Sequence, residues 1–289
     1  MAYYWFVHST KDFSSTMYDM ATPKLAQKVA EERKADSVKW LEVWSRPDPA
    51  ARRPRLTRDH IAAAAMSIAD QEGLNAVSMR RIAAELGAGT MTLYHYVQTK
   101  DEVLTLVFDR FVGEVLLRAD EPMPAEWRAA LTHIAHRTRA ALTRHPWILD
   151  ITDDPLIGPN GLRHFDQLLA ALSALPITLE QKLEIIAAVD EFVFGHCLQA
   201  RNNLAFTPDD VAERMGEYVT GLVVEGHYPE LARLIADETV LVVWRRLEAA
   251  MASPDRFDRT LQRLLDGIEH DLVRRGVSRR SPSRRGQTS

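Results

Sequence analysis

The sequence predicts an all-α protein, and three observations support this fold class. Apolar side chains recur at helical spacing nearly throughout residues 57–275, no alternating strand pattern is bounded by hairpin turns, and residues suited to helix caps stand at the ends of the periodic segments. At 289 residues with 46% apolar side chains, the chain is long enough for about two domains with a sizeable core. We therefore expect a small helical domain over residues 57–103 and a larger one over residues 104–275.

Residues 1–56 are expected to form an N-terminal extension. Residues 1–44 contain only a weak helical pattern. Residues 45–56 combine three prolines with four arginines, which favours an extended arm because proline lacks a backbone donor and restricts the residue before it. At the other end, residues 276–289 are expected to be a disordered basic tail.

The first two helices are expected at residues 57–73 and 79–86. Thr57 can cap the first helix and Gly73 can end it. Ser78 can cap the second, and Gly87 follows Ala83 by four residues. A small residue where two helices approach, followed by a glycine that can adopt positive φ, is the pattern that a helix-turn-helix needs.

A third helix is expected at residues 90–96, with Leu93 and Val97 packing inward. Thr99 and Glu102 then form the capping box of a fourth helix. Because an α-helix fits the major groove of DNA, the outward residues of the third helix are candidates for reading base edges. These residues are Thr90, Met91, Thr92 and His95.

Residues 78–100 carry a recognisable motif, Ser-Met-Arg-Arg-Ile-Ala-Ala-Glu-Leu-Gly-Ala-Gly-Thr-Met-Thr-Leu-Tyr-His-Tyr-Val-Gln-Thr-Lys. It resembles the DNA-binding domain of the tetracycline-repressor (TetR) family, over residues 57–110. Residues 80–91 most resemble the branch that includes regulators of antibiotic export. One departure is Gly89, because relatives often carry Ser or Thr at this cap, and glycine lacks the hydroxyl that could touch phosphate.

The resemblance implies operator DNA as the partner, with phosphate contacts around the third helix and along the arm. Besides the four reading residues, the predicted DNA-binding set contains Arg46, Arg52, Arg53, Arg55, Thr57, Ser78, Met79, Arg80, Gly89, Tyr94, Tyr96 and Lys100. Two alternatives stay open. Tyr94 and Tyr96 could instead pack the small domain, and the arginine arm could be a linker whose charge only raises solubility.

The charge distribution agrees with a DNA-binding module attached to an acidic body. Residues 45–100 carry eight basic and five acidic side chains, whereas residues 101–269 carry sixteen and twenty-eight. Basic charge gathered on one segment of an otherwise acidic protein is expected where that segment meets phosphates. Acidic bodies also keep proteins soluble, so charge alone does not decide between these explanations.

The larger domain is expected to contain amphipathic helices at residues 127–144, 162–175, 179–203, 209–226 and 254–275. The resemblance implies a homodimer in which residues 179–203 and 254–275 pair with their symmetry mates, and hence a palindromic or near-palindromic operator. The predicted dimer residues are Leu261, Leu264, Leu265, Ile268 and Leu272. Alternatively, both apolar stripes could face the core of their own subunit.

A small-molecule pocket is expected between the fourth helix and the body helices, where apolar walls would carry a few polar groups. Its candidate residues are His133, Arg137, Trp147, Phe165, Phe192, His196 and Gln199. Each of them could equally be an ordinary core or surface residue.

Other classes of protein find little support in the sequence. There is no Gly-x-x-x-x-Gly-Lys loop, no His-Glu-x-x-His and no Gly-x-Ser-x-Gly motif, and the single cysteine, Cys197, stands in no zinc-like cluster. No apolar run reaches the roughly 18 residues of a membrane span, and no signal peptide develops at the N-terminus. We expect a cytoplasmic repressor without metal or cofactor, released by a small hydrophobic molecule such as an antibiotic. The alternatives are an all-α enzyme, a metal-binding protein or a protein-interaction module.

Overall fold

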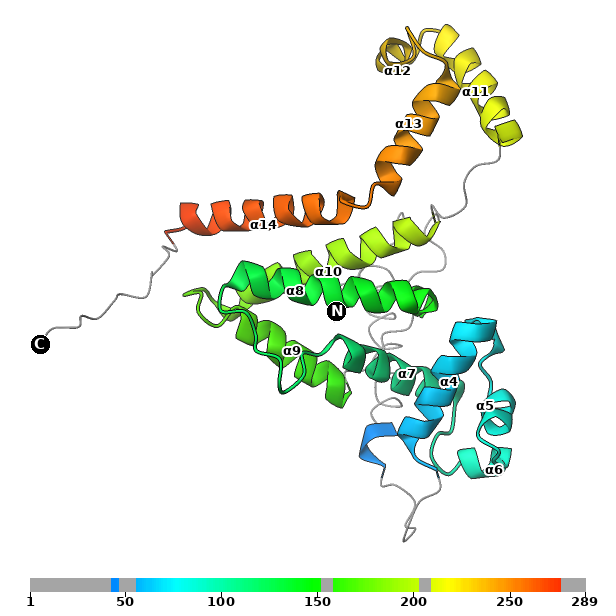
Figure 1. The fold of residues 1–289 in the computed structure, drawn as a ribbon, viewed down its shortest axis with the longest axis vertical. Coiled ribbons are helices and arrows are strands. Elements are labelled where there is room, and N and C mark those ends of the chain that lie inside the picture. Colours follow the sequence, from blue (N-terminus) through cyan, green and yellow to red (C-terminus); the bar gives the residue numbers. More distant parts are fainter. Residues whose placement is uncertain (1–42, 47–55, 152–157, 203–208, 277–289) are drawn as a thin grey trace, which may run out of the picture. The chain divides into compact units, whose positions relative to one another are not determined.

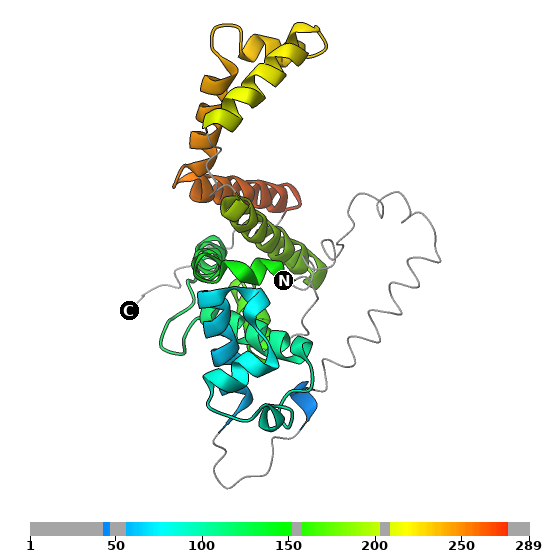
Figure 2. The same cartoon turned by 90° about the vertical axis from the view of Figure 1, so that its right-hand side faces the viewer.

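The structure, a computed structural model, describes residues 43–46, 56–151, 158–202 and 209–276 (Figures 1 and 2). Every regular element among these residues is helical, which confirms the predicted fold class. The chain divides into two compact units, and the division falls within one long helix, after Phe194. We describe each unit by itself.

The N-terminal part of the first unit is a small helical head. It contains α4 (Arg58–Glu72), the short 3-10 helix η1 (Leu74–Ala76), α5 (Met79–Glu85) and α6 (Thr90–Leu93). Figure 1 shows α5 beside α4, and α6 follows next to α5. Its core is made of fully buried apolar side chains from all three helices, among them Ile61, Ile68, Ile82 and Leu93. We call residues 56–99 the reading head.

The head continues directly into α7 (Lys100–Val115), which packs along α4 (Figure 1). After α7 the first unit contains α8 (Trp127–Arg144), η2 (Pro146–Asp150), α9 (Pro159–Ala171) and most of α10 (Leu179–Asn202). Phe111 on α7 is fully buried, as are Leu131 and Leu142 on α8 and Leu172 just after α9. One core therefore connects α7 to the helices that follow it.

The second unit contains the end of α10 together with α11 (Asp209–Val224), α12 (Pro229–Leu234), α13 (Val240–Ala252) and α14 (Arg256–Arg274). Residues 240–243, although rich in valine, begin α13, as their helical context predicts. Within this unit the ring of His196 meets Phe257 edge-on, with centroids 5.0 Å apart. Arg256 also donates to Gln199 Oε1 over 2.6 Å, so the start of α14 lies against the end of α10.

Helix ends follow the predicted caps closely. The side chains of Thr57, Ser78 and Thr99 each accept a hydrogen bond from the backbone N–H three residues on, over 3.1–3.3 Å. Gly73 ends α4 with a φ of 85°. The capping box at Thr99 differs from the prediction, because the Glu102 carboxylate accepts from the N–H of Gln98 at 2.8 Å.

Candidate nucleic-acid interface

The helix-turn-helix is built from α5, a tight turn and α6. Ile82 and Ala83 bury the inner face of α5. The chain then reverses at Gly87, whose φ of 59° lies in the left-handed region that favours glycine. The N–H of Ala88 donates to the carbonyl of Ala83 over 2.9 Å, which closes the turn. This geometry brings α6 out at the surface of the reading head.

The helix α6 is shorter than predicted. Regular helix ends at Leu93, and residues 94–96 form a turn in which the N–H of Tyr96 bonds to the carbonyl of Leu93 over 2.8 Å. Its N-cap, Gly89, supplies no side-chain bond, so the first turn lacks the stabilisation that Ser78 gives to α5. The short helix still presents a defined outer face.

The outer face of α6 is exposed. Met91 is 75% exposed and Tyr94 is 44% exposed, while Thr92 and His95 are also open to solvent. Among the other predicted DNA-binding residues, Ser78, Arg80, Gly89 and Lys100 are exposed, and Thr57, Met79 and Thr90 are half-buried. An exposed methionine and threonine on α6, with an exposed histidine in the turn after it, can contact base edges, and exposed cations of the same head can contact phosphates.

Tyr96 and Arg46 differ from the rest of the predicted set. Tyr96 is only 6% exposed and packs in the head, which is the alternative that the sequence left open for it. Arg46 forms two hydrogen bonds with the buried carboxylate of Glu102, so the fold engages its guanidinium. The DNA contact predicted at these two positions stays a prediction. Arg52, Arg53 and Arg55 lie outside the described residues.

Arg81 fixes the orientation of α5, although the sequence did not single it out. Its guanidinium pairs with Glu72 at the end of α4 over 2.7 Å and with Glu85 over 2.8 Å. The hydrogen bond with Glu72 is the largest cause that raises the pKa of Arg81. Arg80 and Arg81 are neighbours in sequence, yet Arg81 has internal partners while Arg80 is exposed.

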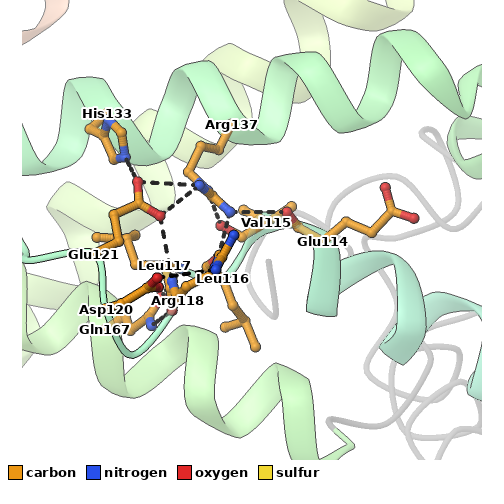
Figure 3. A network of polar contacts seen from close by, with 10 residues as sticks. All are labelled: Glu114, Val115, Leu116, Leu117, Arg118, Asp120, Glu121, His133, Arg137 and Gln167. Carbon is orange, nitrogen blue, oxygen red and sulfur yellow. Dashed lines mark hydrogen bonds and ion pairs between the residues drawn. The ribbon is translucent and has the colours of Figure 1, made fainter.

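Two predicted ligand-binding residues belong to a polar network at the end of α7 (Figure 3). Arg137 donates to the carbonyl of Val115 over 2.8 Å and to that of Leu116 over 2.5 Å. It also pairs with Glu121, which contacts His133 Nε2 at 2.8 Å. The hydrogen bond with His133, ahead of the charge of Arg137, lowers the pKa of Glu121. Both residues therefore have partners within the fold, and their pocket role stays a prediction.

A third predicted ligand residue, Trp147, joins η2 to α4. Its indole N–H donates to Asp70 Oδ1 over 2.7 Å, and the buried His145 contacts the same oxygen through Nδ1 over 2.7 Å. His145 Nε2 lies 3.3 Å from Glu114 on α7. Sequence reasoning missed His145 and Asp70, because 75 residues separate them and no local spacing predicts their contact.

The remaining predicted ligand residues fall in both units. Phe165 and Phe192 are half-buried in the first unit, whereas His196 and Gln199 belong to the second and contact the start of α14. A different polar group stands out in the first unit. His164 on α9 is 3% exposed, and neither of its ring nitrogens has a hydrogen-bond partner there. Burial lowers the pKa of His164, against the opposing charge of Asp190.

The predicted dimer residues on α14 differ in burial. Leu261 and Leu265 are fully buried within the single chain, and Leu272 is 6% exposed. These three therefore follow the alternative in which the stripe faces its own subunit. Leu264 and Ile268 are half-buried and remain accessible in part.

Two other kinds of site, a metal centre and a membrane span, find no support among the described residues. No group of three or more His, Cys, Asp or Glu side chains there is placed to hold a metal ion. No described helix is both long and apolar enough to cross a membrane.

Comparison with known proteins gave consistent matches in sequence and in structure. The family model "Bacterial regulatory proteins, tetR family" matches residues 61–107, and "Tetracyclin repressor-like, C-terminal domain" matches residues 121–272. The HTH-type transcriptional repressor DrrR1 of Streptomyces coeruleorubidus is 33% identical over 239 residues, covering 78% of this chain and 82% of the relative. The class E tetracycline repressor of Escherichia coli is 27% identical over 155 residues, covering 52% and 72%. The structure of ActR from Streptomyces coelicolor with actinorhodin is 26% identical, with a TM-score of 0.57 and coverage of 75% of this chain and 98% of ActR.

Proposed function

Since this chain belongs to the TetR family of bacterial transcriptional regulators, we propose that it is a cytoplasmic repressor that binds a palindromic operator as a homodimer and leaves it when a hydrophobic molecule binds. The observation that carries the proposal is the exposed outer face of α6 and of the turn after it, in a head where Arg80 on α5 and Lys100 at the start of α7 are exposed as well. Met91 and Thr92 supply methyl groups for contact with thymine, and His95 supplies a hydrogen-bonding ring. Lys100 lies at the N-terminus of α7, where the helix dipole also attracts a phosphate.

The similarity to ActR supports a small-molecule effector. ActR has been crystallised with actinorhodin, and the match covers 98% of ActR. We infer that this chain responds to a hydrophobic antibiotic or related metabolite, and that the gene it represses serves the export of that compound. A ligand that prefers one arrangement of the two reading heads weakens operator binding by the ratio of its affinities for the two states.

The first experiment identifies the operator and the effector in turn. Duplexes bound by the full-length protein are selected from a random-sequence pool, and their affinity is titrated at several salt concentrations. We expect a pseudo-palindrome with half-sites about one helical turn, or a multiple of it, apart, and binding that weakens steeply with salt. Actinorhodin and a panel of other hydrophobic antibiotics are then tested for release of the duplex.

The expected effector releases DNA and also raises the melting temperature of the DNA-free protein, because it binds the folded state. Two results would contradict the proposal. One is recovery of no preferred duplex. The other is that every releasing compound competes at the DNA surface and leaves the melting temperature of the protein unchanged.

A further inference from the structure

Residues 43–46 precede the reading head and are packed into the first unit. Val43 is fully buried, and Trp44 and Arg46 are half-buried. Residues 43–45 form a short helical stretch. The sequence predicted only a weak helix and an extended arm here, so this packing is a feature that the sequence did not indicate. We call residues 43–46 the strap.

Trp44 attaches the strap to the start of α9. A Cβ atom on Gly158, the N-cap of α9, would lie 2.5 Å from Trp44 Cζ2 and 2.5 Å from Asp109 Oδ1. Only glycine therefore lets the indole and the carboxylate approach the backbone at this point. Asp109, on α7, accepts hydrogen bonds from the N–H groups of Asn160 and Gly161, each over 3.0 Å. The first turn of α9 is thus held by α7 on one side and meets the strap on the other.

Arg46 attaches the strap to α7 and, through its backbone, to α4. Its guanidinium donates to Glu102 over 2.9 and 3.3 Å, and Glu102, only 4% exposed, also accepts from the N–H of Gln98. The carbonyl of Arg46 accepts from Arg58, at the start of α4, over 2.9 Å. Arg58 in turn donates to the carbonyl of Tyr96, just after α6, over 3.3 Å.

Besides the contact of Asp70 on α4 with Trp147 and His145, the reading head is connected to the helices behind it in two ways. The first is α7, which begins at the head and continues to Val115. The second is the strap, which touches the first turn of α9 at Trp44 and the bases of α4 and α7 at Arg46. Each connection at a separate point restricts how far a rigid body can tilt, and the strap adds one at a point separate from α7 and from Asp70.

We propose that the strap sets the orientation of the reading head and transmits displacement of α9 to it. This inference rests on the proposed DNA-binding function, because it concerns how well the head is aligned for the operator. It gives Trp44 and Arg46 a positioning role, in which neither side chain touches DNA. Energetic coupling between distant sites is carried by packed side chains and hydrogen bonds of this kind.

The test measures operator affinity for full-length variants, with a duplex selected by the wild-type protein from a random pool. Arg46→Gln breaks the head end of the strap, and Trp44→Leu breaks the α9 end. Each is expected to weaken binding about tenfold, within the range known for such couplings. The double variant should bind about as weakly as either single variant, because a strap released at one end is already released. Arg118→Gln is the control, since Arg118 is 76% exposed and pairs only with an exposed aspartate.

The salt dependence of binding separates the strap from an arm that touches DNA. If Arg46 positions the head, the slope of log affinity against log salt is unchanged in Arg46→Gln. If Arg46 contacts a phosphate, the slope falls by about one. Three results would each contradict the proposed role of the strap. They are a reduced salt slope in Arg46→Gln, a double variant whose loss of affinity is the product of the two single losses, and wild-type affinity in both single variants.

Two further measurements keep the result interpretable. Melting temperatures report whether each variant folds. If Trp44→Leu does not fold, Trp44→Phe, which keeps a ring against Gly158, replaces it. Failure of the wild-type protein to select any duplex would instead contradict the proposed function, and it would do so before any variant is examined.

Discussion

Arg137 illustrates how the surroundings of a residue decide its role. An arginine on the inward side of a body helix is a reasonable candidate for a ligand contact. Arg137, which is on α8, instead contacts the C-terminal end of α7. Helix ends leave backbone carbonyls without partners, and a planar guanidinium can serve two of them together with a carboxylate. Arg137 does this for the carbonyls of Val115 and Leu116 and for Glu121. The same fork geometry that would suit an anionic ligand is used to end a helix.

We predict that Arg137→Lys lowers the free energy of unfolding by about 1–2 kcal/mol, because an ammonium group keeps the charge and loses the fork. Urea unfolding followed by circular dichroism measures this. Arg118→Lys is the matched control, and its mostly exposed ion pair should make it change stability by less than about 0.5 kcal/mol. Equal effects from the two substitutions would show that Arg137 does not support the end of α7.

His164 predicts a loss of stability at acid pH. Because burial lowers its pKa in the folded state, the unfolded chain takes up a proton near pH 6.5 while the folded chain resists it. Well above pH 6.5, His164 is neutral in both states and its titration does not change the free energy of unfolding. As the pH falls below 6.5, protonation of the unfolded chain lowers the free energy of unfolding, until the pH reaches the pKa of the folded state. We expect the wild type to lose more stability than His164→Gln between pH 7.5 and pH 5.5, by urea unfolding. Parallel losses would mean that His164 does not titrate differently on unfolding.

At the scale of elements, the sequence predicted the helix caps and helix bounds that depend on neighbouring residues in the chain. Thr57, Ser78 and Thr99 cap helices as expected, because a cap needs only a side-chain oxygen and an N–H three residues on. The bounds of α8 and α10 agree with the prediction to within a residue, since both helices have a sustained apolar period. By contrast, α6 begins at Thr90 as predicted but ends at Leu93, because residues 94–96 form a turn in which the N–H of Tyr96 bonds to the carbonyl of Leu93.

Contacts between distant elements were the part that the sequence did not predict. Arg46 and Glu102 are 56 residues apart, so no spacing rule relates them, and Arg46 was assigned to DNA on composition alone. The assignment of Tyr96 to DNA came from the family motif, and its burial depends on how the turn after α6 folds back. Most of the predicted face of α6 is nevertheless exposed, as periodicity indicated.

Two exposed cations on the helices before and after α6 give a prediction at the same scale. Arg80 and Lys100 are exposed on separate helices, so each can neutralise one phosphate. We expect Arg80→Ala and Lys100→Ala each to weaken binding similarly for different duplex sequences and to reduce the salt slope by about one. Gel-shift titrations at four salt concentrations measure both effects. Arg118→Ala serves as control, and an unchanged slope for both variants would remove these residues from the interface.

At the scale of the whole molecule, a palindromic operator requires two reading heads held at one spacing. A single chain supplies one head, so the proposed function depends on a dimer. The structure limits the residues of the predicted apolar stripe on α14 that can contact a second subunit. Leu261 and Leu265 are fully buried within the chain, whereas Leu264 and Ile268 retain exposure. A charge at Leu265 would disturb the fold itself, so this position cannot report on dimerisation alone.

Leu264→Glu is therefore the variant that tests the dimer. If α14 pairs across a two-fold axis, the substitution places a carboxylate in a surface that must be dry, and the dimer dissociates. We expect sedimentation velocity to show monomers, circular dichroism to show nearly unchanged helix content, and operator affinity to fall by at least about 100-fold, because one head loses the contribution of the other. Gln262→Glu, which adds the same charge on the exposed side of α14, should remain dimeric and bind normally. A Leu264→Glu protein that sediments as a dimer would mean that α14 serves its own subunit and that the two heads are joined elsewhere.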